Sequence, residues 1–521
     1  MLLKPLGEIT QSQEYNSRTR SYYYEYMFSS PPTNKEWLRF EEVYAPRVLA
    51  FHLSEAQNYS ALLDVLCRIR SSKPILPNLR SLHCRELKLN GLQEPALIFA
   101  HEGIREFMLI DSNSYSVSTC TFFDAMHTRI PHLAKLIIDI NNDSQYTPPM
   151  IEMIRSFSGL RSLTLPAFTA MHQLMQDISA LPRLKELNII SAPGQPSIGS
   201  LVSSGNRAKK RGKESQPALV DKECFLSLET LRISCSYAKA AAFLRHWTFF
   251  YSLSSIQIIT PEQGHPYIME RLLTDIYAAC PRIAHISLKI KPGTIDTSQA
   301  IALAVVPENV LTIQNLRPIL QCLTIATFEL VHSLPLYLGQ EDMQEIASAW
   351  PHLKSVNLGC APLTLKQSTS KRLGLSALLP FARFCPDIEE LGLLIDAKSD
   401  VPCDAEIEEI PSPFRRLRVL SVGISEIDHE GVIAECLSFL CPSGCEIRYG
   451  ADWYESDESS SDTKKWKTVS ELLPRLLSVR ARDEKRIMAL QKRLQQQIAS
   501  LEQKITLSEN AKDQAIQTDG I

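Results

Sequence analysis

The sequence predicts an α/β solenoid of irregular helix–strand repeats, followed by a C-terminal helix. Three observations lead to this prediction: a recurring Pro-x-Leu-x-x-Leu-x-Leu pattern, amphipathic helical segments before many of its copies, and a polar, helix-favouring segment near the end of the chain. The composition, 44% hydrophobic and 22% charged, is ordinary for a globular protein. Because one helix–strand unit cannot bury its own apolar face, the units are expected to stack on one another.

Fourteen strict or loose copies of the pattern can be aligned, and each has one central apolar residue. These residues are Phe51, Leu82, Phe107, Leu136, Leu163, Leu187, Leu231, Ile256, Ile286, Leu323, Val356, Leu391, Leu420 and Ile447. Proline stands five residues before the central residue in nine copies, whereas random placement would give roughly one. The Leu-x-Leu alternation predicts a strand with one apolar face, and the proline predicts the end of the preceding helix.

The helical half of the unit is clearest in the segments 267–280, 171–181 and 430–441. Their apolar residues recur at intervals of three and four, which places them on one helical face. In the first segment, Cys280 closes that face and Pro281 ends the helix. A Cys-Pro pair with His285 close behind could indicate reactive or metal-binding chemistry, but the repeat predicts a structural joint.

This pattern resembles that of leucine-rich-repeat (LRR) solenoids with long, irregular repeats, and its Cys-Pro form at Cys280 and Cys385 is similar to the repeats of F-box/LRR proteins. Segment 34–53 also resembles the region that follows the F-box in many fungal F-box proteins. The residues that carry this second likeness are Trp37, Phe40, Tyr44, Pro46 and Val48. The resemblance covers roughly 34–450, and it implies a substrate receptor that brings a protein target to an SCF-type ubiquitin ligase through the adaptor of a cullin.

Residues 1–33 contain no recognisable F-box. "KPLGEI" is at best a fragment of the usual opening motif, and the Tyr- and Ser-rich remainder lacks a three-helix pattern. We therefore expect a disordered or poorly structured N-terminus, and it stays open whether an F-box was lost or lies upstream of Met1. The alternative function is a non-ligase LRR scaffold that uses its solenoid and its C-terminal helix for protein–protein interaction.

Four segments are predicted to lie outside the repeats. The Gly-, Ser-, Pro- and Lys-rich residues 191–220 predict a disordered insertion in the 34–450 solenoid, whose basic stretch 207–213 is a localisation signal or a solvated loop. Residues 451–466 predict an acidic, Ser-rich linker, and residues 467–510 a helix. The tail 511–521 contains a Gln-Thr motif that resembles those bound by dynein light chains through strand addition.

The predicted C-terminal helix could self-associate as a coiled coil. Its apolar residues fit heptad a and d positions at Leu473, Leu476, Ile487, Leu490, Leu494 and Leu501. The same register puts Arg480, Asp483, Gln497 and Lys504 in the seam, which interrupts it. A solvated single helix and a helix docked on the last repeat stay open as alternatives.

No sequence motif supports catalysis or a cofactor. Glycine-rich phosphate loops, H-E-x-x-H and G-x-S-x-G are absent, and Cys441 and Cys445, with His429 upstream, fall short of the four ligands that structural zinc needs. We expect no enzyme activity and no metal. A net charge of −3 favours neither nucleic acid nor membrane, and thirteen scattered cysteines without a signal peptide or apolar span predict an intracellular protein of the cytoplasm, the nucleus or both.

The residue after each central apolar position is expected to point away from the core, onto the concave sheet face. These residues are mixed and mostly polar, which suits recognition of a protein target by shape and scattered hydrogen bonds. The candidates for partner contact are His83, Thr164, Asn188, Arg232, Gln257 and Asn357. A plain solvated face would have the same composition, so this alternative also stays open.

Overall fold

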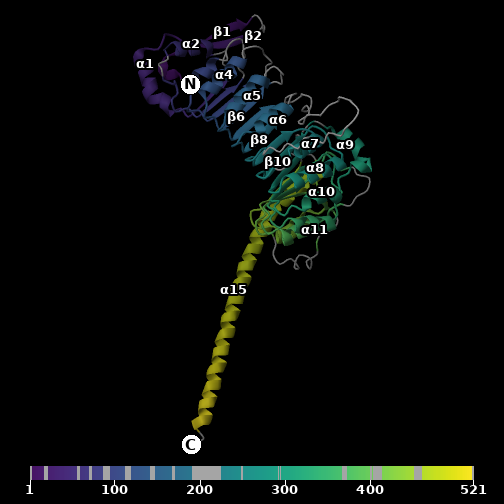
Figure 1. Ribbon diagram of the computed structural model, residues 1–521. Helices are drawn as coiled ribbons and strands as arrows, with labels where there is room; N and C mark the ends of the chain where they lie inside the picture. The colour runs from purple at the N-terminus through teal and green to yellow at the C-terminus, as the bar shows by residue number, and fades with distance from the viewer. Residues whose placement is uncertain are drawn as a thin grey trace. The chain divides into compact units, whose positions relative to one another are not determined.

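Helices and strands alternate along the chain, as Figure 1 shows. The computed structural model describes residues 3–16, 21–54, 59–69, 73–85, 94–111, 119–140, 147–166, 171–190, 224–247, 250–291, 293, 295–365, 372–398, 402, 414–450 and 460–518. The predicted insertion at 191–220, with its basic stretch, lies outside these residues. Two units can be distinguished: unit 1 comprises Met1–Leu336 with Leu363–Ser368, and unit 2 comprises Tyr337–Pro362 with Thr369–Ile521.

Unit 1 contains a parallel sheet whose strands follow one another in chain order. They are β3 (Ala50–Ser54), β4 (Ser81–Arg85), β5 (Glu106–Asp111), β6 (Lys135–Ile140), β7 (Ser162–Pro166), β8 (Glu186–Ile190), β9 (Thr230–Ser234), β10 (Ser255–Thr260), β11 (His285–Ile290) and β12 (Thr327–Val331). The predicted central residues from Phe51 to Ile286 lie side by side in this ladder. All of them except Phe51 are buried, so the predicted strand register is confirmed for these nine repeats.

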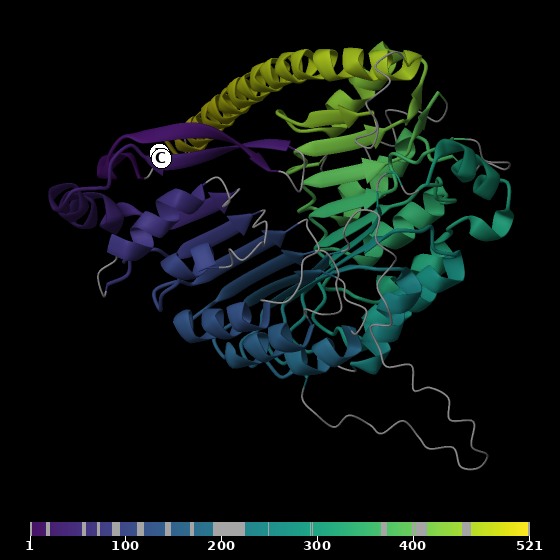
Figure 2. The same cartoon turned by 90° about the horizontal axis from the view of Figure 1, so that it is seen from above.

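Helices cover one face of this sheet (Figure 2). They are α2 (Ser60–Ile69), α3 (Glu94–Phe99), α4 (Thr119–Arg129), α5 (Thr147–Ser156), α6 (Met171–Ser179), α7 (Tyr237–His246), α8 (Pro266–Ala279), α9 (Thr297–Ala304) and α10 (Ile313–Leu320). The predicted apolar faces point inward: Met269, Leu272 and Ile276 of α8 are all buried. The core therefore lies between the helices and the sheet, and the opposite sheet face carries the side chains that alternate with it.

Tight turns precede the strands, and the one at Cys280, between α8 and β11, is an example. The N–H of Cys280 donates to Ile276 at the end of α8, and the Cys280 carbonyl accepts from the N–H of Ile283 at 3.2 Å. Pro281 takes the second position of this turn, where its fixed φ is favourable. Burial raises the pKa of the Cys280 thiol to about 12, so this cysteine is a core residue at a structural joint, as predicted.

One backbone carbonyl in each repeat holds the following strand in place. The carbonyl of Ser254 accepts from the N–H groups of both Ala284 and His285, at 2.9 Å each. The same two-to-one arrangement stands at the start of every strand from β4 to β12. Since these contacts involve only the backbone, repeats of different lengths keep the same strand register.

The predicted repeat around Leu323 is wrong. β12 is centred on Phe328, which is fully buried, whereas Leu323 is 65% exposed. Pro318, taken as the turn proline, lies inside α10. The turn instead runs from Cys322 to Ile325, whose N–H donates to the Cys322 carbonyl at 3.4 Å. This turn contains no proline. The nearest proline, Pro318, therefore predicts a central residue at Leu323, five residues before Phe328.

In the N-terminal segment 1–33, the described residues 3–16 and 21–33 are not poorly structured, contrary to the expectation for this segment. They form an antiparallel hairpin of β1 (Ile9–Asn16) and β2 (Ser21–Phe28), preceded by the short helix η1 (Lys4–Leu6). Tyrosine and phenylalanine favour extended backbone, and Tyr15 and Tyr22 stand opposite each other with ring centroids 5.1 Å apart. Such cross-strand aromatic pairs stabilise a hairpin, a signal that a search for helices overlooks.

The hairpin leads into α1 (Asn34–Arg39), η2 (Phe40–Tyr44) and η3 (Ala45–Arg47). Thr33 caps α1: its hydroxyl accepts from the N–H of Glu36, whose carboxylate accepts from the N–H of Thr33 at 2.8 Å. Trp37 and Phe40 are buried with ring centroids 5.7 Å apart. These two residues, which carry the likeness to the region after an F-box, form the core at the N-terminal end of unit 1.

Unit 2 continues the helix–strand pattern. Its strands are β13 (Ser355–Leu358), β14 (Glu390–Leu393), β16 (Val419–Gly423) and β18 (Glu446–Tyr449), with a separate small pair of β15 (Asp396–Ala397) and β17 (Glu426–Ile427). Its helices are α11 (Gln340–Ala349), η7 (Leu375–Leu378), α12 (Leu379–Phe384), α14 (Glu430–Leu440) and α15 (Ser461–Thr518). The predicted central residues from Val356 to Ile447 are buried and pair in register.

Gly423 ends β16 in a conformation that requires glycine. Its φ is +53°, and a Cβ atom added there would lie 1.8 Å from the carbonyl oxygen of Cys360. Gly444, in the turn before β18, also has a positive φ of +91° but has open space around it. Only the first of these glycines is therefore fixed by both its backbone angle and its surroundings.

α15 begins at Ser461, inside the segment 451–466 that was predicted to be a linker; residues 451–459 lie outside the described part. It contacts α14, β17 and β18, and its first turns bury Trp466, Val469, Leu473 and Leu477. Docking on the last repeat, which was one of the open alternatives, is therefore confirmed for these turns.

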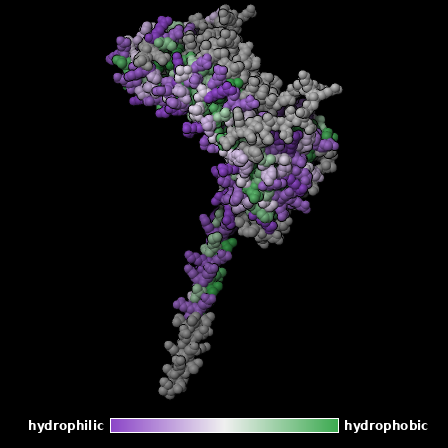
Figure 3. All heavy atoms as spheres, viewed as in Figure 1, coloured by the Kyte–Doolittle hydropathy of each residue, from purple (hydrophilic) through white to green (hydrophobic). Residues whose placement is uncertain are grey.

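The remainder of α15 leaves the last repeat. Residues 481–504 are all exposed, and Figure 3 shows apolar side chains, in green, among hydrophilic ones along this part. The helix continues to Thr518, so most of the predicted tail 511–521 is helical. Residues 515–518 of the Gln-Thr motif, which spans 515–519, are thus helical and not in the extended form that strand addition to a light chain requires; Asp519 lies outside the described residues.

Candidate protein-binding face

A row of outward-pointing side chains crosses unit 1, one from each strand. Its members are His52, His83, Met108, Ile137, Thr164, Asn188, Arg232, Gln257, Ser287 and Glu329. Each follows the central apolar residue of its strand, as predicted. Glu329 takes the place predicted for Thr324, because β12 is centred on Phe328.

Four of the six predicted contact residues are neighbours in this row. Thr164, Asn188, Arg232 and Gln257 occupy matching positions on β7, β8, β9 and β10, and we call them the central row. Arg232 is exposed and the other three are partly exposed. None of the four side chains makes a hydrogen bond or an ion pair with the described part of the chain, so their donors and acceptors are available to a partner.

The positions on either side of the central row belong to the same sheet face, because side chains two residues apart point the same way. Before it come Glu186, Thr230 and Ser255, and after it Ile190 and Ile259. The two isoleucines are only partly buried. Polar groups of both signs beside exposed aliphatic carbon form the kind of mixed surface that proteins use to bind one another.

The size of the face also suits a protein partner. Ten strands at a spacing of about 4.8 Å extend over about 43 Å, and a five-residue strand spans about 17 Å. The resulting area of about 700 Å² is close to the ~800 Å² that each partner contributes to a standard interface. The face is therefore large enough to carry a specific complex.

His83, a predicted contact residue, is part of a polar network on β3 to β6. Its Nε2 lies 2.9 Å from the Ser81 hydroxyl and 3.7 Å from a Glu106 carboxylate oxygen, and its ring centroid is 4.3 Å from that of His52. Lys135 Nζ lies 2.7 Å from the same carboxylate. Burial, and then the charge of His52, lowers the pKa of His83. Burial alone would raise the pKa of Glu106, but the hydrogen bond and charge of Lys135 outweigh it and lower this pKa.

Sequence reasoning missed Glu106 and Lys135. Each stands immediately before a central apolar residue. Side chains on both sides of a buried strand residue point to the opposite face, so the same alternation that predicted the residues after the central positions also predicts these two. A similar network closes the other end of the sheet: the Ser287 hydroxyl donates to Glu329 at 2.9 Å, and Lys289 Nζ lies 2.8 Å from the same carboxylate. At each end of the face, the polar side chains thus bond to their neighbours at that same end, in contrast to those of the central row.

Asn357, the sixth candidate, lies in unit 2 and is not brought together with the other five. Its side-chain oxygen accepts from the N–H of Cys360 at 3.4 Å, and a Cβ atom added at Gly392 would lie 3.0 Å from its Cγ. These contacts give Asn357 a structural role at the end of β13. Contact between Asn357 and a partner stays a prediction.

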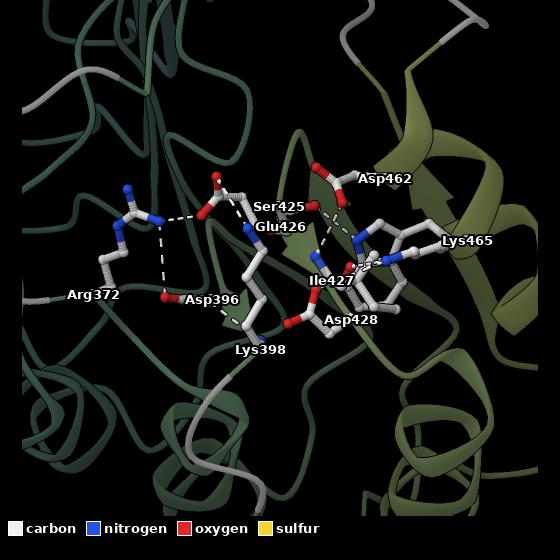
Figure 4. Close-up of polar contacts among 10 residues, drawn as sticks. Arg372, Asp396, Lys398, Ser425, Glu426, Ile427, Asp428, Asp462 and Lys465 are labelled. Atoms are coloured by element: carbon white, nitrogen blue, oxygen red, sulfur yellow. Dashed lines mark hydrogen bonds and ion pairs between the residues drawn. The ribbon is translucent and has the colours of Figure 1, made fainter.

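Unit 2 has its own cluster of charges, around β15 and β17 (Figure 4). Arg372 forms ion pairs with Glu426 and, at 3.8 Å, with Asp396. On the other side of β17, Lys465 of α15 donates to the carbonyl of Ile427 at 3.0 Å. Because opposite charges within the chain meet here, the cluster fastens the small sheet and the start of α15 rather than offering a binding site.

The described residues include no group of three or more His, Cys, Asp or Glu side chains that could hold a metal ion. Cys441 and Cys445 instead form a thiol pair: a hydrogen bond to Cys445, followed by burial, raises the pKa of Cys441 well above its ordinary value. His429 is the N-cap residue of α14. No helix in the described part of the chain is long and apolar enough to cross a membrane.

Comparison with known proteins finds no family, and the solved structure described below is a weak likeness. No family model matches the chain, and no curated protein matches it. Among solved structures it is similar to the crystal structure of a Rad7 and Elc1 complex in yeast, with 16% sequence identity, a TM-score of 0.31, and coverage of 71% of this chain and 84% of that chain. The fold and the face described above therefore rest on the chain's own residues.

Proposed function

We propose that this protein is a noncovalent protein-recognition solenoid that holds its target on the outward sheet face of unit 1. The observation that carries the proposal is the central row, where four adjacent strands present polar side chains without partners among the described residues. In a plain solvated face, such groups would bond to water alone. Here they stand beside partly exposed aliphatic residues, on a face of the size that a protein interface needs.

The resemblance of the repeats, and of residues 34–53, to F-box/LRR proteins supports a more specific role. We propose a substrate receptor for an SCF-type ubiquitin ligase, acting in the cytoplasm or the nucleus. The chain would hold the target, and the other ligase subunits would transfer ubiquitin, so the chain itself would need neither catalytic residues nor a cofactor. The adaptor that links F-box proteins to a cullin would be its second partner.

The second candidate is a scaffold without ligase function. Two observations favour it: residues 1–33 contain a β-hairpin where the three helices of an F-box would be expected, and residues 481–504 of α15 form an exposed helix with apolar side chains. In this case the solenoid would bind one partner and α15 another.

The recognition proposal is tested with a charge reversal at the centre of the face. Proteins that co-purify with the tagged full-length chain are identified and then purified, and their affinities are measured for Arg232→Glu and for the matched control Arg282→Glu. Arg282 is also exposed but lies in the turn before β11, away from the sheet face. We expect Arg232→Glu to weaken a target at least tenfold and the control to leave it unchanged; equal effects of the two variants would refute the proposal.

The ligase role is tested separately by asking which partners the wild-type chain retains. We expect both the adaptor and a cullin to co-purify with it, and Arg232→Glu to keep them while losing the target. Targets recovered without an adaptor or a cullin would exclude the receptor role and leave the scaffold.

A further inference from the structure

The exposed part of α15 carries a line of large apolar side chains, which we call the α15 stripe; Met488, which is 67% exposed, lies beside this line. Its members are Ile487, Leu490, Leu494, Ile498 and Leu501, each between 54% and 58% exposed. Over the same stretch the other side chains are mostly charged or amide-bearing, as the alternation of green and purple in Figure 3 shows. A line of this kind on a projecting helix is expected to be covered by another protein surface.

The spacing of the α15 stripe identifies the kind of surface. Successive members are three, four, four and three residues apart, which keeps them on one face of a straight helix of 3.6 residues per turn. Ile487 and Ile498, and likewise Leu490 and Leu501, are eleven residues apart, and an eleven-residue repeat, at about 3.67 residues per turn, is typical of helices that form a right-handed supercoil. The predicted heptad register placed Gln497 in the seam. The exposed apolar line instead contains Ile498 at this point of the helix.

The N-terminal part of the predicted seam is also replaced. Leu473 is buried in the docked turns of α15, and the side chain of Arg480 lies over the ring of Phe439 in α14. Neither residue is available to a second helix. The surface for association is thus confined to the exposed part, from about residue 484 onward.

The charges beside the α15 stripe favour one kind of partner helix and one relative orientation of the two helices. At 3.6 residues per turn, Glu484 and Glu502 lie on one flank of the stripe, and Arg486 and Lys504 on the other. When two copies of a helix pack in parallel and in register, opposite flanks meet; when they pack antiparallel, identical flanks meet. Parallel packing therefore sets Glu484 against Arg486 of the second copy, and Glu502 against Lys504, whereas antiparallel packing sets like charges together.

We propose that the chain forms a parallel, in-register dimer with a second copy of itself through the α15 stripe. The partner is the same helix because its own flanks provide the complementary charges at both ends. The fifteen residues from Ile487 to Leu501 span only about 21 Å of helix, so the association is expected to be weak and dependent on concentration. This proposal does not depend on what the sheet face of unit 1 binds.

Sedimentation of the full-length chain over a series of concentrations tests the surface. We expect a monomer–dimer equilibrium that Leu494→Lys weakens at least tenfold. The matched control is Gln496→Lys, which adds the same charge to the opposite side of the helix and is expected to have no effect. A wild-type chain that stays monomeric throughout the series, or equal effects of the two lysines, would overturn the proposal.

Charge reversal on the flank tests the direction. In the parallel dimer, Glu484→Arg faces Arg486 of the second copy, and we expect about threefold to tenfold weaker association at low salt. Adding Arg486→Glu to this variant restores opposite charges and is expected to restore the wild-type affinity. An antiparallel dimer predicts the reverse, because Glu484→Arg would then face Glu502 and tighten association.

The reversal at Arg486 also breaks its ion pair with Asp483, one turn earlier at 3.5 Å. Circular dichroism of each variant shows whether the helix is retained, so that a loss of helix is not mistaken for a loss of pairing. Tighter association of Glu484→Arg with full helix content would overturn the parallel arrangement.

Discussion

One tryptophan contributes both buried carbon and a hydrogen bond to the attachment of α15, and its removal gives a measurable test of that attachment. Trp466 is 1% exposed, and its Nε1–H donates to the carbonyl of Ser425 at 2.9 Å. Trp466→Ala removes the ring and leaves a cavity, which costs about 3–5 kcal/mol of unfolding free energy. Trp466→Phe keeps most of the buried carbon but removes the N–H, and the unpaired carbonyl costs about 1–3 kcal/mol.

Two measurements check that Trp466→Ala costs more unfolding free energy than Trp466→Phe. Hydrogen exchange of residues 461–480 reports whether the first turns of α15 stay docked, and urea unfolding gives the free energy, with a separate transition allowed for each unit. Lys467→Ala, at the exposed neighbouring position, should change the free energy by no more than about 0.5 kcal/mol. Equal losses for Trp466→Ala and Lys467→Ala would refute the role assigned to the ring.

Three further predictions can be checked by urea unfolding. Gly423→Ala should cost at least about 4 kcal/mol because the added Cβ collides with backbone, and Gly444→Ala only about 1–2 kcal/mol for its positive φ; equal costs would contradict the geometry. Phe328→Ala should cost about 3–5 kcal/mol and Leu323→Ala less than about 0.5; the reverse order would restore the sequence register. Burial lowers the pKa of His332 to about 4, below the usual 6.5, so the unfolded state binds the proton first. Stability should therefore fall by up to about 3 kcal/mol as the pH drops from 6.5 to 4, and His332→Gln should abolish this loss.

The strands could be predicted because their signal is local. Alternation around a central residue such as Leu187 is contained within five residues and fixes both the strand and its buried face. Pro318 misled because a proline near the C-terminal end of a helix resembles one in the turn after it. The burial of Trp466 could not be predicted at all, since its partner carbonyl on Ser425 lies 41 residues away.

The candidate face was predictable in outline for the same reason. Positions such as Asn188 and Arg232 follow directly from the alternation, and the structure places them side by side. Whether a side chain is already engaged is a different question, because it depends on neighbours in other repeats. Glu106 is held by Lys135, 29 residues later, and no spacing within one repeat indicates such a contact.

The paired N–H groups at the start of each strand also bear on how such a chain can vary during evolution. Leu187 and Leu231 are 44 residues apart, yet Glu229 and Thr230 still donate together to the carbonyl of Lys185, at 2.8 and 2.9 Å. The two residues before a central position must each keep an N–H, so proline is excluded there. Insertions that fall after a strand leave this pair intact. The protein can therefore acquire long new segments between repeats without disturbing the spacing of the side chains on the candidate face.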